Sequence, residues 1–351
     1  MMAAMQMSDG VHVAAVLEPG TEDNHPFVAR LEALHVPITR IVVGARGYLN
    51  EYRSVRALIA QLKPGVVHTH GYRADVIGSL AARRHGVPTV STVHGFTGGS
   101  IRNRLNEVVQ RFALRGFGAV IAVAAPIVGR LTAAGVPRSR IHCIPNGFTL
   151  AVDRLERSSA RQKLGLSNEE LIAGWVGRLS REKGADVMLR ALARSDSGWH
   201  LSIIGEGPER NELLRLSSKL GISERVAWHG AVTNAGSLFG AFDAFVLSSR
   251  TEGTPITLLE AMDAGVPIVA ARVGGVPDVI GAAHAILVAP EQPDAVARAL
   301  QEIQQDPAAA AERSVRARER LISAFGASTW LRSIDAVYGA AQASSSNHRR
   351  A

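Results

Sequence analysis

The sequence has one cysteine, few aromatic residues and no long apolar segment, and each shortage excludes a class of protein. Cys143 alone cannot form an intrachain disulfide, which favours a reducing compartment, and we expect it to be a small buried residue beside Ile144. No stretch approaches the roughly 20 consecutive apolar residues that cross a bilayer. The start, Met1 to Gly10, has neither a basic region nor an apolar core of a signal peptide. We therefore expect a cytoplasmic protein.

Several sequence motifs of nucleotide and nucleic-acid chemistry are also missing. No P-loop is present, and no Gly-x-Gly-x-x-Gly follows the first apolar run. The segment Gly205-Glu206-Gly207-Pro208-Glu209-Arg210 lacks the third glycine of that pattern, which argues against a nicotinamide enzyme. No zinc-ligand cluster or RNA-binding signature occurs, so we expect no cofactor and no nucleic-acid partner.

Charge and composition fit an α/β protein that binds something acidic. With 39 Lys+Arg against 31 Asp+Glu, the formal charge is +8, which suits an acidic ligand or an anionic membrane surface. The chain is 46% hydrophobic with 34 glycines, as in proteins with buried parallel strands. Its 351 residues can form two domains of about 150 residues each.

Short apolar runs alternate with helical patterns along both halves of the chain. This alternation predicts parallel, doubly wound sheets, in which ligands bind beyond the carboxyl ends of the strands. Residues Thr149 to Gln162 are charged and have little apolar period, so they mark the domain boundary. We predict domains over 1–155 and 156–325, with a terminal segment 326–351. Expected strands are 11–17, 38–43, 64–71, 88–95, 119–124, 140–144, 171–176, 201–204, 226–229, 244–247, 267–270 and 285–288.

The stretch from Ala244 to Ile280 carries the strongest local signal. The run 244–247 reads as a strand that ends in a polar loop, and a helix follows. We predict Thr254 as the N-cap, Pro255 as the first helical residue and Gly265 as the end of the helix. The start of such a helix presents unpaired backbone N–H groups, and Gly253 lets an anion approach them. The sequence therefore predicts a phosphate site here.

Two carboxylates flank this predicted phosphate site. Glu252 lies in the loop and Glu260 lies about a turn and a half into the helix. Since carboxylates do not bind phosphate, sugar hydroxyls are their natural partners. This arrangement suits a sugar nucleotide, whose diphosphate lies between two hydroxyl-bearing groups.

At this point the residues resemble a known family. Glu252 and Glu260, spaced as E-x7-E, with the following Gly-Val-Pro-Ile-Val-Ala and Gly-Gly-Val-Pro-Asp-Val-Ile segments, resemble retaining glycosyltransferases of the GT-B fold, family 4. Gly177-Arg178-Leu179 with Lys183-Gly184 resembles the family's diphosphate-binding loop. The resemblance implies two Rossmann-like, doubly wound parallel-sheet domains facing a cleft, with a last helix around 330–338 returning to the first domain.

The resemblance also implies roles for individual residues. Arg178 and Lys183 would stabilise the departing diphosphate, with Gly177, Gly253, Thr254 and Pro255 lining the donor site. Glu260 would accept hydrogen bonds from the ribose, and Glu252 would contact the transferred sugar. His94, at a strand end in the first domain, matches a histidine that lies against the donor sugar. His68 and His70 are left without a role.

The implied activity is transfer of a hexosyl group from a nucleotide-diphosphate sugar to a hydroxyl acceptor, with retention, in cell-surface polysaccharide or glycolipid synthesis. No Asp-x-Asp is present, so we expect no metal. The first loop, Glu18 to Asp23, offers only Gly20 where the family usually has paired glycines, which leaves the acceptor undefined. Two alternatives stay open: a nucleotide-sugar epimerase of the same fold, and a non-catalytic nucleotide-sugar-binding protein.

A helical pattern over 100–117 has an apolar face edged by arginines. Ile101, Leu105, Val108 and Phe112 share the face, and Arg104, Arg111 and Arg115 line one edge. The pattern fits a core-facing helix with solvated arginines, or a basic face that contacts the inner surface of the membrane and a lipid-linked acceptor. Both interpretations stay open at this point.

Overall fold

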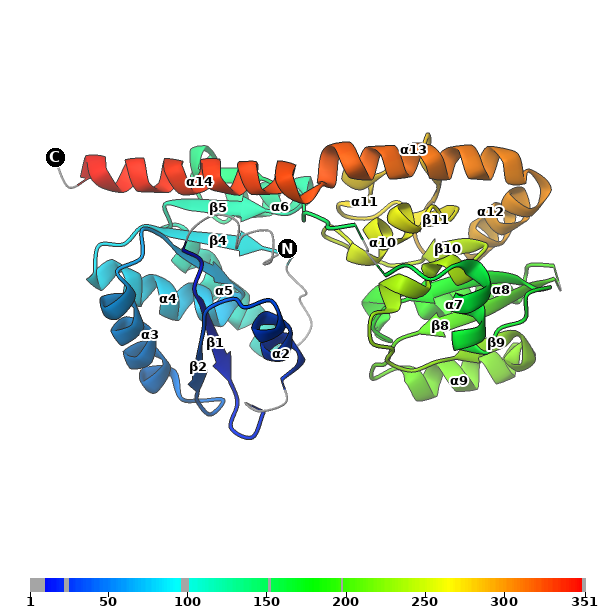
Figure 1. Cartoon of the computed structure of the whole chain (residues 1–351), viewed down its shortest axis with the longest axis horizontal. Coiled ribbons are helices and arrows are strands. Elements are labelled where there is room, and N and C mark those ends of the chain that lie inside the picture. The colour runs from blue at the N-terminus through cyan, green and yellow to red at the C-terminus, as the bar shows by residue number, and fades with distance from the viewer. Residues whose placement is uncertain (1–9, 22–24, 96–100, 151–152, 197, 349–351) are drawn as a thin grey trace. The chain divides into compact units, whose positions relative to one another are not determined.

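The computed structural model divides into two compact units, one spanning 148–326 and the other combining 1–147 with 327–351. It describes residues 10–21, 25–95, 101–150, 153–196 and 198–348, while the side chains of 101–104 and 345–348 lie outside this description. Both units alternate strands and helices, and all strand pairs are parallel, which confirms the predicted fold class (Figure 1).

The unit boundary lies earlier than the predicted 155/156. The backbone N–H of Phe148 donates to the carbonyl of Phe325 at 2.8 Å, and that of Leu155 donates to the carbonyl of Ser237 at 3.0 Å. These bonds tie 148–155 to the second unit, which then ends at Gly326.

The second unit contains one six-stranded sheet in the order β12-β11-β10-β7-β8-β9. From the central β7 and β10 pair, the chain proceeds outward through β8 and β9 on one side and through β11 and β12 on the other. A reversal of this kind is a topological switch point, where loops at the carboxyl edge diverge and leave room for a ligand. The strands are β7 (Leu171–Val176), β8 (Trp199–Ile204), β9 (Val226–Trp228), β10 (Ala244–Leu247), β11 (Ile268–Ala271) and β12 (Ile286–Val288).

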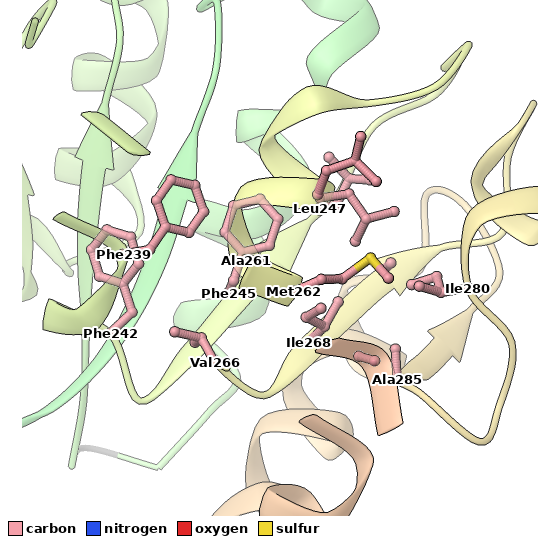
Figure 2. Close-up of a cluster of buried hydrophobic side chains, with 14 of the residues drawn as sticks. Phe239, Phe242, Phe245, Leu247, Ala261, Met262, Val266, Ile268, Ile280 and Ala285 are labelled. Atoms are coloured by element: carbon pink, nitrogen blue, oxygen red, sulfur yellow. The ribbon is translucent and has the colours of Figure 1, made fainter. Parts of the chain in front are cut away.

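Helices cover both faces of this sheet, because its strands are apolar on both sides. In β10, Phe245 and Leu247 join one buried cluster, whereas Ala244 and Val246 join another. Figure 2 shows the first cluster, in which the rings of Phe239 and Phe245 are tilted by 45° with centroids 5.2 Å apart. The α-helices are α7 (Arg157–Leu164), α8 (Ala185–Leu192), α9 (Arg210–Lys219), α10 (Ile256–Ala264), α11 (Val276–Val279), α12 (Pro293–Gln305) and α13 (Pro307–Phe325), and the 3-10 helices are η2 (Arg181–Lys183), η3 (Ser223–Arg225) and η4 (Ala235–Ala241).

Helix α7 begins within 149–162, the segment that the sequence assigned to the domain boundary. Arg161 is fully buried and donates to the carbonyl of Ala241 at 2.9 Å, to that of Glu170 at 3.0 Å and to the carboxylate of Asp243 at 2.6 Å. One of the charges that marked the boundary therefore anchors α7 to the rest of the second unit.

The first unit contains a four-stranded sheet, in the order β3-β4-β5-β6, and a separate β1-β2 pair. The strands are β1 (Val13–Leu17), β2 (Ile38–Val42), β3 (Val67–His70), β4 (Thr89–Val93), β5 (Ala119–Ala122) and β6 (Ile141–Cys143). The helices are α2 (Pro26–Ala33), α3 (Tyr48–Leu62), α4 (Tyr72–Arg84), α5 (Ile101–Leu114), α6 (Ala125–Ala133), the 3-10 helix η1 (Arg138–Arg140) and α14 (Ala327–His348).

Helix α14 packs on the four-stranded sheet although it follows the whole second unit in sequence. Trp330, Ile334 and Val337 form one buried cluster with Val90 of β4 and Ile121 of β5. Cys143, expected to be buried, is exposed in the short edge strand β6.

The expected core-facing side of α5 is exposed. Leu105, Val108 and Phe112 are 63%, 58% and 72% exposed, so the interpretation of this face as core is wrong. The helix is anchored instead through Leu114, which is buried, and through Gln110, which donates to Asp75 at 2.6 Å. Periodicity located an apolar face but gave no information about which side meets the core.

Candidate active site

The loops that follow β7 and β10 pack against each other at the switch point of the second unit. The Trp175 indole donates to Ser248 Oγ at 3.1 Å, and that hydroxyl donates to the carbonyl of Gly184 at 2.7 Å. Gly184 has a φ of +68°, and a Cβ there would lie 2.1 Å from the Ser248 carbonyl oxygen. Only glycine fits this position, so the close approach of the two loops depends on Gly184.

This approach brings two predicted site residues into direct contact. Lys183 Nζ donates to both carboxylate oxygens of Glu252, at 2.8 and 2.9 Å. The Glu252 side chain is 6% exposed and the Lys183 side chain 32% exposed. Ser249 also donates to Glu252, at 2.7 Å. The carboxylate is thus fixed and ionically compensated, while part of the ammonium faces solvent.

Arg178 lies on the same loop, exposed to solvent. The charges of both Arg178 and Lys183 act on Glu182. The pKa of Glu182 is lowered mainly by a hydrogen bond from Ser180 and further by these two charges, against the opposing effect of burial. The loop therefore presents two cations at the carboxyl edge of the sheet.

The start of α10 borders the same loop, although its first residue differs from the prediction. The helix begins at Ile256 and Pro255 is its N-cap, with a ψ of 118° that is extended; Thr254, predicted as the cap, precedes it. The extended ψ of Pro255 moves the first helical residue one position later than predicted. The left-handed ending at Gly265 (φ 68°) is confirmed.

Glycines hold the surrounding turns close to this site. The N–H of Gly275 donates to the carbonyl of Glu252 at 3.1 Å, and the N–H of Gly177 donates to the carbonyl of Ile204 at 3.0 Å. A Cβ on Gly274 would lie 1.9 Å from the Glu252 carbonyl oxygen. The Glu252 to Pro255 segment is therefore supported from behind by the turn after β11.

Glu260 is a partly buried carboxyl on α10 without a hydrogen-bond donor among the residues that the structure describes. Burial raises its pKa to about 7. A Cβ on Gly236 would lie 2.8 Å from Glu260 Oε1, so the glycine of η4 leaves space beside the carboxyl. Burial without a partner is unfavourable, and such carboxyls are found where a ligand supplies the partner.

Three histidines stack at the carboxyl ends of β3 and β4 in the first unit. The rings of His68 and His70 lie 4.6 Å apart, and those of His70 and His94 lie 5.6 Å apart. His70 Nδ1 lies 3.3 Å from His94 Nε2, within hydrogen-bond reach. His68 contacts the hydroxyls of Tyr338 on α14 at 2.7 Å and Thr92 at 2.8 Å.

Burial disfavours the charged form of these imidazoles. It lowers the pKa of His68 to about 3 and that of His70 to about 4, with repulsion from neighbouring histidines adding to the effect. Burial also lowers the pKa of His94, although His70 and His94 each keep an exposed edge. A neutral imidazole can both donate and accept a hydrogen bond, so the stack is suited to a polar, uncharged ligand.

The structure thus groups Gly177, Arg178, Lys183 and the Glu252 to Pro255 segment on one edge of the second unit, with Glu260 on the adjoining helix. His94 belongs to the other unit, where His68 and His70 accompany it. Sequence reasoning missed Ser249, which donates to Glu252 in its own loop, and Arg250, which binds the two loops together. Their only signal was three polar residues placed directly after a buried strand.

Sequence comparison connects the chain to sugar-transferring enzymes. "Glycosyl transferases group 1" matches residues 156–320, and "Glycosyl transferase 4-like domain" matches 1–147. Glycogen synthase of Mycobacterium tuberculosis (strain H37Rv) is 31% identical over 295 residues, which cover 80% of this chain and 70% of that protein. D-inositol 3-phosphate glycosyltransferase 1 of Catenulispora acidiphila is 28% identical over 271 residues, 69% of this chain and 64% of that protein.

Solved structures share the fold. Anabaena Alr3699/HepE in complex with UDP-glucose aligns with a TM-score of 0.84 and 20% identity, covering 94% of this chain and 100% of that one. Sucrose-phosphate synthase of Thermosynechococcus elongatus aligns with a TM-score of 0.81 and 22% identity, covering 96% of this chain and 90% of that one.

Proposed function

The chain belongs to the glycosyltransferases with the GT-B fold, and we propose that it transfers a hexosyl group from a nucleotide-diphosphate sugar to a hydroxyl acceptor with retention of anomeric configuration. The observation that carries this proposal is the Lys183 and Glu252 pair at the switch point, beside an exposed Arg178 and the start of α10. Cations and helix amides there suit a diphosphate, and the carboxylates suit sugar hydroxyls.

In the proposed reaction, the acceptor oxygen attacks C1 of the donor sugar while the bond from C1 to the diphosphate breaks. The acceptor proton passes to the leaving phosphate on the same face of the sugar. Negative charge therefore grows on the diphosphate, where Arg178, Lys183 and the α10 amides stabilise it. Glu252 holds hydroxyls of the transferred sugar, and Glu260 accepts hydrogen bonds from the ribose.

Exchange of Arg178 for alanine tests this assignment directly. Loss of one preorganised donor to a developing charge lowers turnover by about 10²–10³-fold. Arg190→Ala, an exposed arginine on α8, is the matched control and keeps wild-type turnover. Wild-type turnover in Arg178→Ala, or an inverted anomer in the NMR spectrum of the product, would remove the proposal.

The donor class can be identified before the acceptor is known. Because HepE was solved with UDP-glucose, UDP-sugars are the first probes, in a thermal-shift series that includes other nucleotide diphosphates. At 100 times its Kd, a donor stabilises the folded protein by about 2.7 kcal/mol. A chain that changes the donor sugar without an acceptor is an epimerase, and one that only binds is non-catalytic. Since the proposed site neutralises the diphosphate with side chains, activity should persist in EDTA.

We place the acceptor on a lipid or growing polysaccharide at the cytoplasmic face of a membrane, contacted by α5. None of the helices within the described ranges is long and apolar enough to cross a bilayer. Leu105, Val108 and Phe112 are nevertheless exposed together, and the Arg115 guanidinium lies 5.5 Å from the Phe112 ring centroid. Arg111 pairs with Glu107 on the same helix at 3.1 Å, and the Arg104 side chain lies outside the described residues.

Vesicle sedimentation tests this membrane contact. Phe112→Glu should abolish binding to anionic vesicles at low salt, because it removes apolar area and adds a like charge. Val315→Glu on α13, at a residue 58% exposed in the second unit, is the control and should bind as wild type does. Equal binding by both variants, or no binding by the wild type, would exclude the contact.

A further inference from the structure

Arg250 makes the densest set of contacts at the switch point, yet neither the proposed chemistry nor the family resemblance gives it a role. Its guanidinium donates to both carboxylate oxygens of Asp186, each at 2.9 Å, and to the carbonyl of Arg181 at 2.7 Å. A further donation reaches Glu291 at 2.9 Å. The Arg250 side chain is 22% exposed.

These contacts join three segments that follow different strands. Arg250 lies in the loop after β10, Arg181 in the loop after β7, and Glu291 in the turn after β12. The backbone N–H of Arg250 also donates to the carbonyl of Glu182, at 2.8 Å. Residues 181–182 and 250 are therefore fixed to each other by main-chain and side-chain bonds.

The Lys183 and Glu252 pair lies directly beyond this junction. Lys183 follows Glu182 by one residue, and Glu252 follows Arg250 by two. Consecutive residues are only about 3.8 Å apart, so the relative position of the two loops at Arg250 largely sets the position of the pair. Asp186 is a fixed anchor because it lies in the first turn of α8. Burial is the largest single influence on its pKa and raises it, but the hydrogen bond and charge of Arg250, together with backbone hydrogen bonds, lower the pKa below its ordinary value.

We propose that Arg250 is a positioning residue, which holds the loops after β7 and β10 in the register at which Lys183 meets Glu252. This inference rests on the proposed function. A lysine cannot replace it, because an ammonium lacks the planar fork that binds a carboxylate and a carbonyl together. Misplacement of reacting groups by about 1 Å costs on the order of 10²-fold in rate. Donor binding changes less, because α10 and Glu260 lie outside the junction.

Arg250→Lys is the test, and the same exchange at Arg225 is its control. Arg225 also braces backbone, donating to the carbonyls of Trp199 at 2.9 Å and Asp196 at 2.8 Å, but it precedes β9 and so lies at the amino edge of the sheet. We expect Arg250→Lys to lower kcat by about 10–100-fold with the donor KM within threefold. Arg225→Lys should lower Tm by about as much as Arg250→Lys does, but its kcat should stay at the wild-type value.

Asp186→Asn supplies a second variant that leaves Arg250 in place. It should lower kcat, and the double variant Asp186→Asn/Arg250→Lys should be no slower than Arg250→Lys alone, because both changes break one junction. Amide hydrogen exchange should speed up over 181–184 and 248–252 in Arg250→Lys and remain unchanged there in Arg225→Lys.

The outcomes separate this inference from the proposed function. An active wild type with kcat equal in Arg250→Lys and Arg225→Lys overturns the positioning role alone. Unchanged exchange over 181–184 in Arg250→Lys overturns it as well, whether or not the protein transfers sugar. A wild type that neither binds nor consumes any nucleotide sugar overturns the proposed function instead.

Discussion

Replacing Glu260 with glutamine should make the free protein more stable at alkaline pH while weakening donor binding. Burial raises the pKa of this carboxyl from 4.5 to about 7. Between those values the folded chain binds more protons than the unfolded chain, so stability falls as the pH rises through this window. Once the pH exceeds 7, ionised Glu260 lowers the free energy of unfolding by about 3 kcal/mol at most. Glutamine has the same shape and does not ionise.

The assay is urea unfolding followed by tryptophan fluorescence at pH 5 and pH 8. Of the four tryptophans, Trp175, Trp199 and Trp228 lie in the second unit, so the signal reports mainly on the unit that carries Glu260. We expect the free energy of unfolding of Glu260→Gln to exceed that of the wild type by about 2–3 kcal/mol at pH 8 and by much less at pH 5. Glu224→Gln, at an exposed glutamate, is the control and should show no difference at either pH.

Donor binding should change in the opposite direction. A carboxylate that accepts hydrogen bonds from ribose hydroxyls contributes about 1.5–3 kcal/mol, so Glu260→Gln should bind the donor about 10–100-fold more weakly. A variant that is less stable than the wild type at pH 8 would refute the reasoning. So would a stability difference that does not change with pH.

Three further predictions concern other parts of the chain. Lys183→Met should destabilise the second unit by about 1–3 kcal/mol and Glu252→Gln should restore part of this in the double variant, because the lone carboxylate is 6% exposed. In parallel urea titrations, Gly184→Ala should lose more stability than Gly165→Ala; both have left-handed φ, but only at Gly184 would a Cβ clash, 2.1 Å from a carbonyl. The first unit should lose stability as the pH falls from 6.5 towards 4, since the His68 pKa is lowered to about 3, and His68→Gln should reduce this loss in amide hydrogen exchange of β3 and β4. The first prediction is wrong if the effects of Lys183→Met and Glu252→Gln simply add in the double variant. The second is wrong if the two glycine variants lose equal stability, and the third is wrong if His68→Gln leaves the acid-induced loss unchanged.

The strands of the second unit could be read from the sequence because they are buried on both faces. A continuous apolar run that ends in polar or glycine residues leaves little doubt about its bounds, and β7 and β10 match the predicted 171–176 and 244–247. The end of α10 could also be predicted, because the helix ends in a left-handed residue and Gly265 readily adopts that conformation.

Features that depend on distant partners could not be read in this way. Arg161 is buried because carbonyls from 167–170 and Ala241 surround it, and no local sequence pattern predicts these partners. Likewise the apolar face of α5 was visible, whereas its exposure depends on how the helix packs on α4. Tertiary context overrode the local signal in both cases.

The candidate site shows the same division between type and geometry. The loop and helix after one strand indicated Glu252 and Glu260 beside a phosphate site, whereas Arg178 and Lys183 were indicated by the family resemblance. The pairing of Lys183 with Glu252, 69 positions away, follows from the neighbouring places of β7 and β10 in the sheet. That order is a property of the whole unit.

Stability itself marks both candidate sites, independently of any family resemblance. Glu260 holds a carboxyl whose charge burial disfavours, and His68 and His70 hold imidazoles whose charge burial disfavours. The carboxyl weakens folding as the pH rises above 4.5, and the imidazoles weaken it as the pH falls below 6.5. A chain selected only for stability would replace such groups with apolar residues of similar size. Their presence near the carboxyl ends of strands is what a binding function requires, because a ligand that hydrogen-bonds to them recovers part of that free energy.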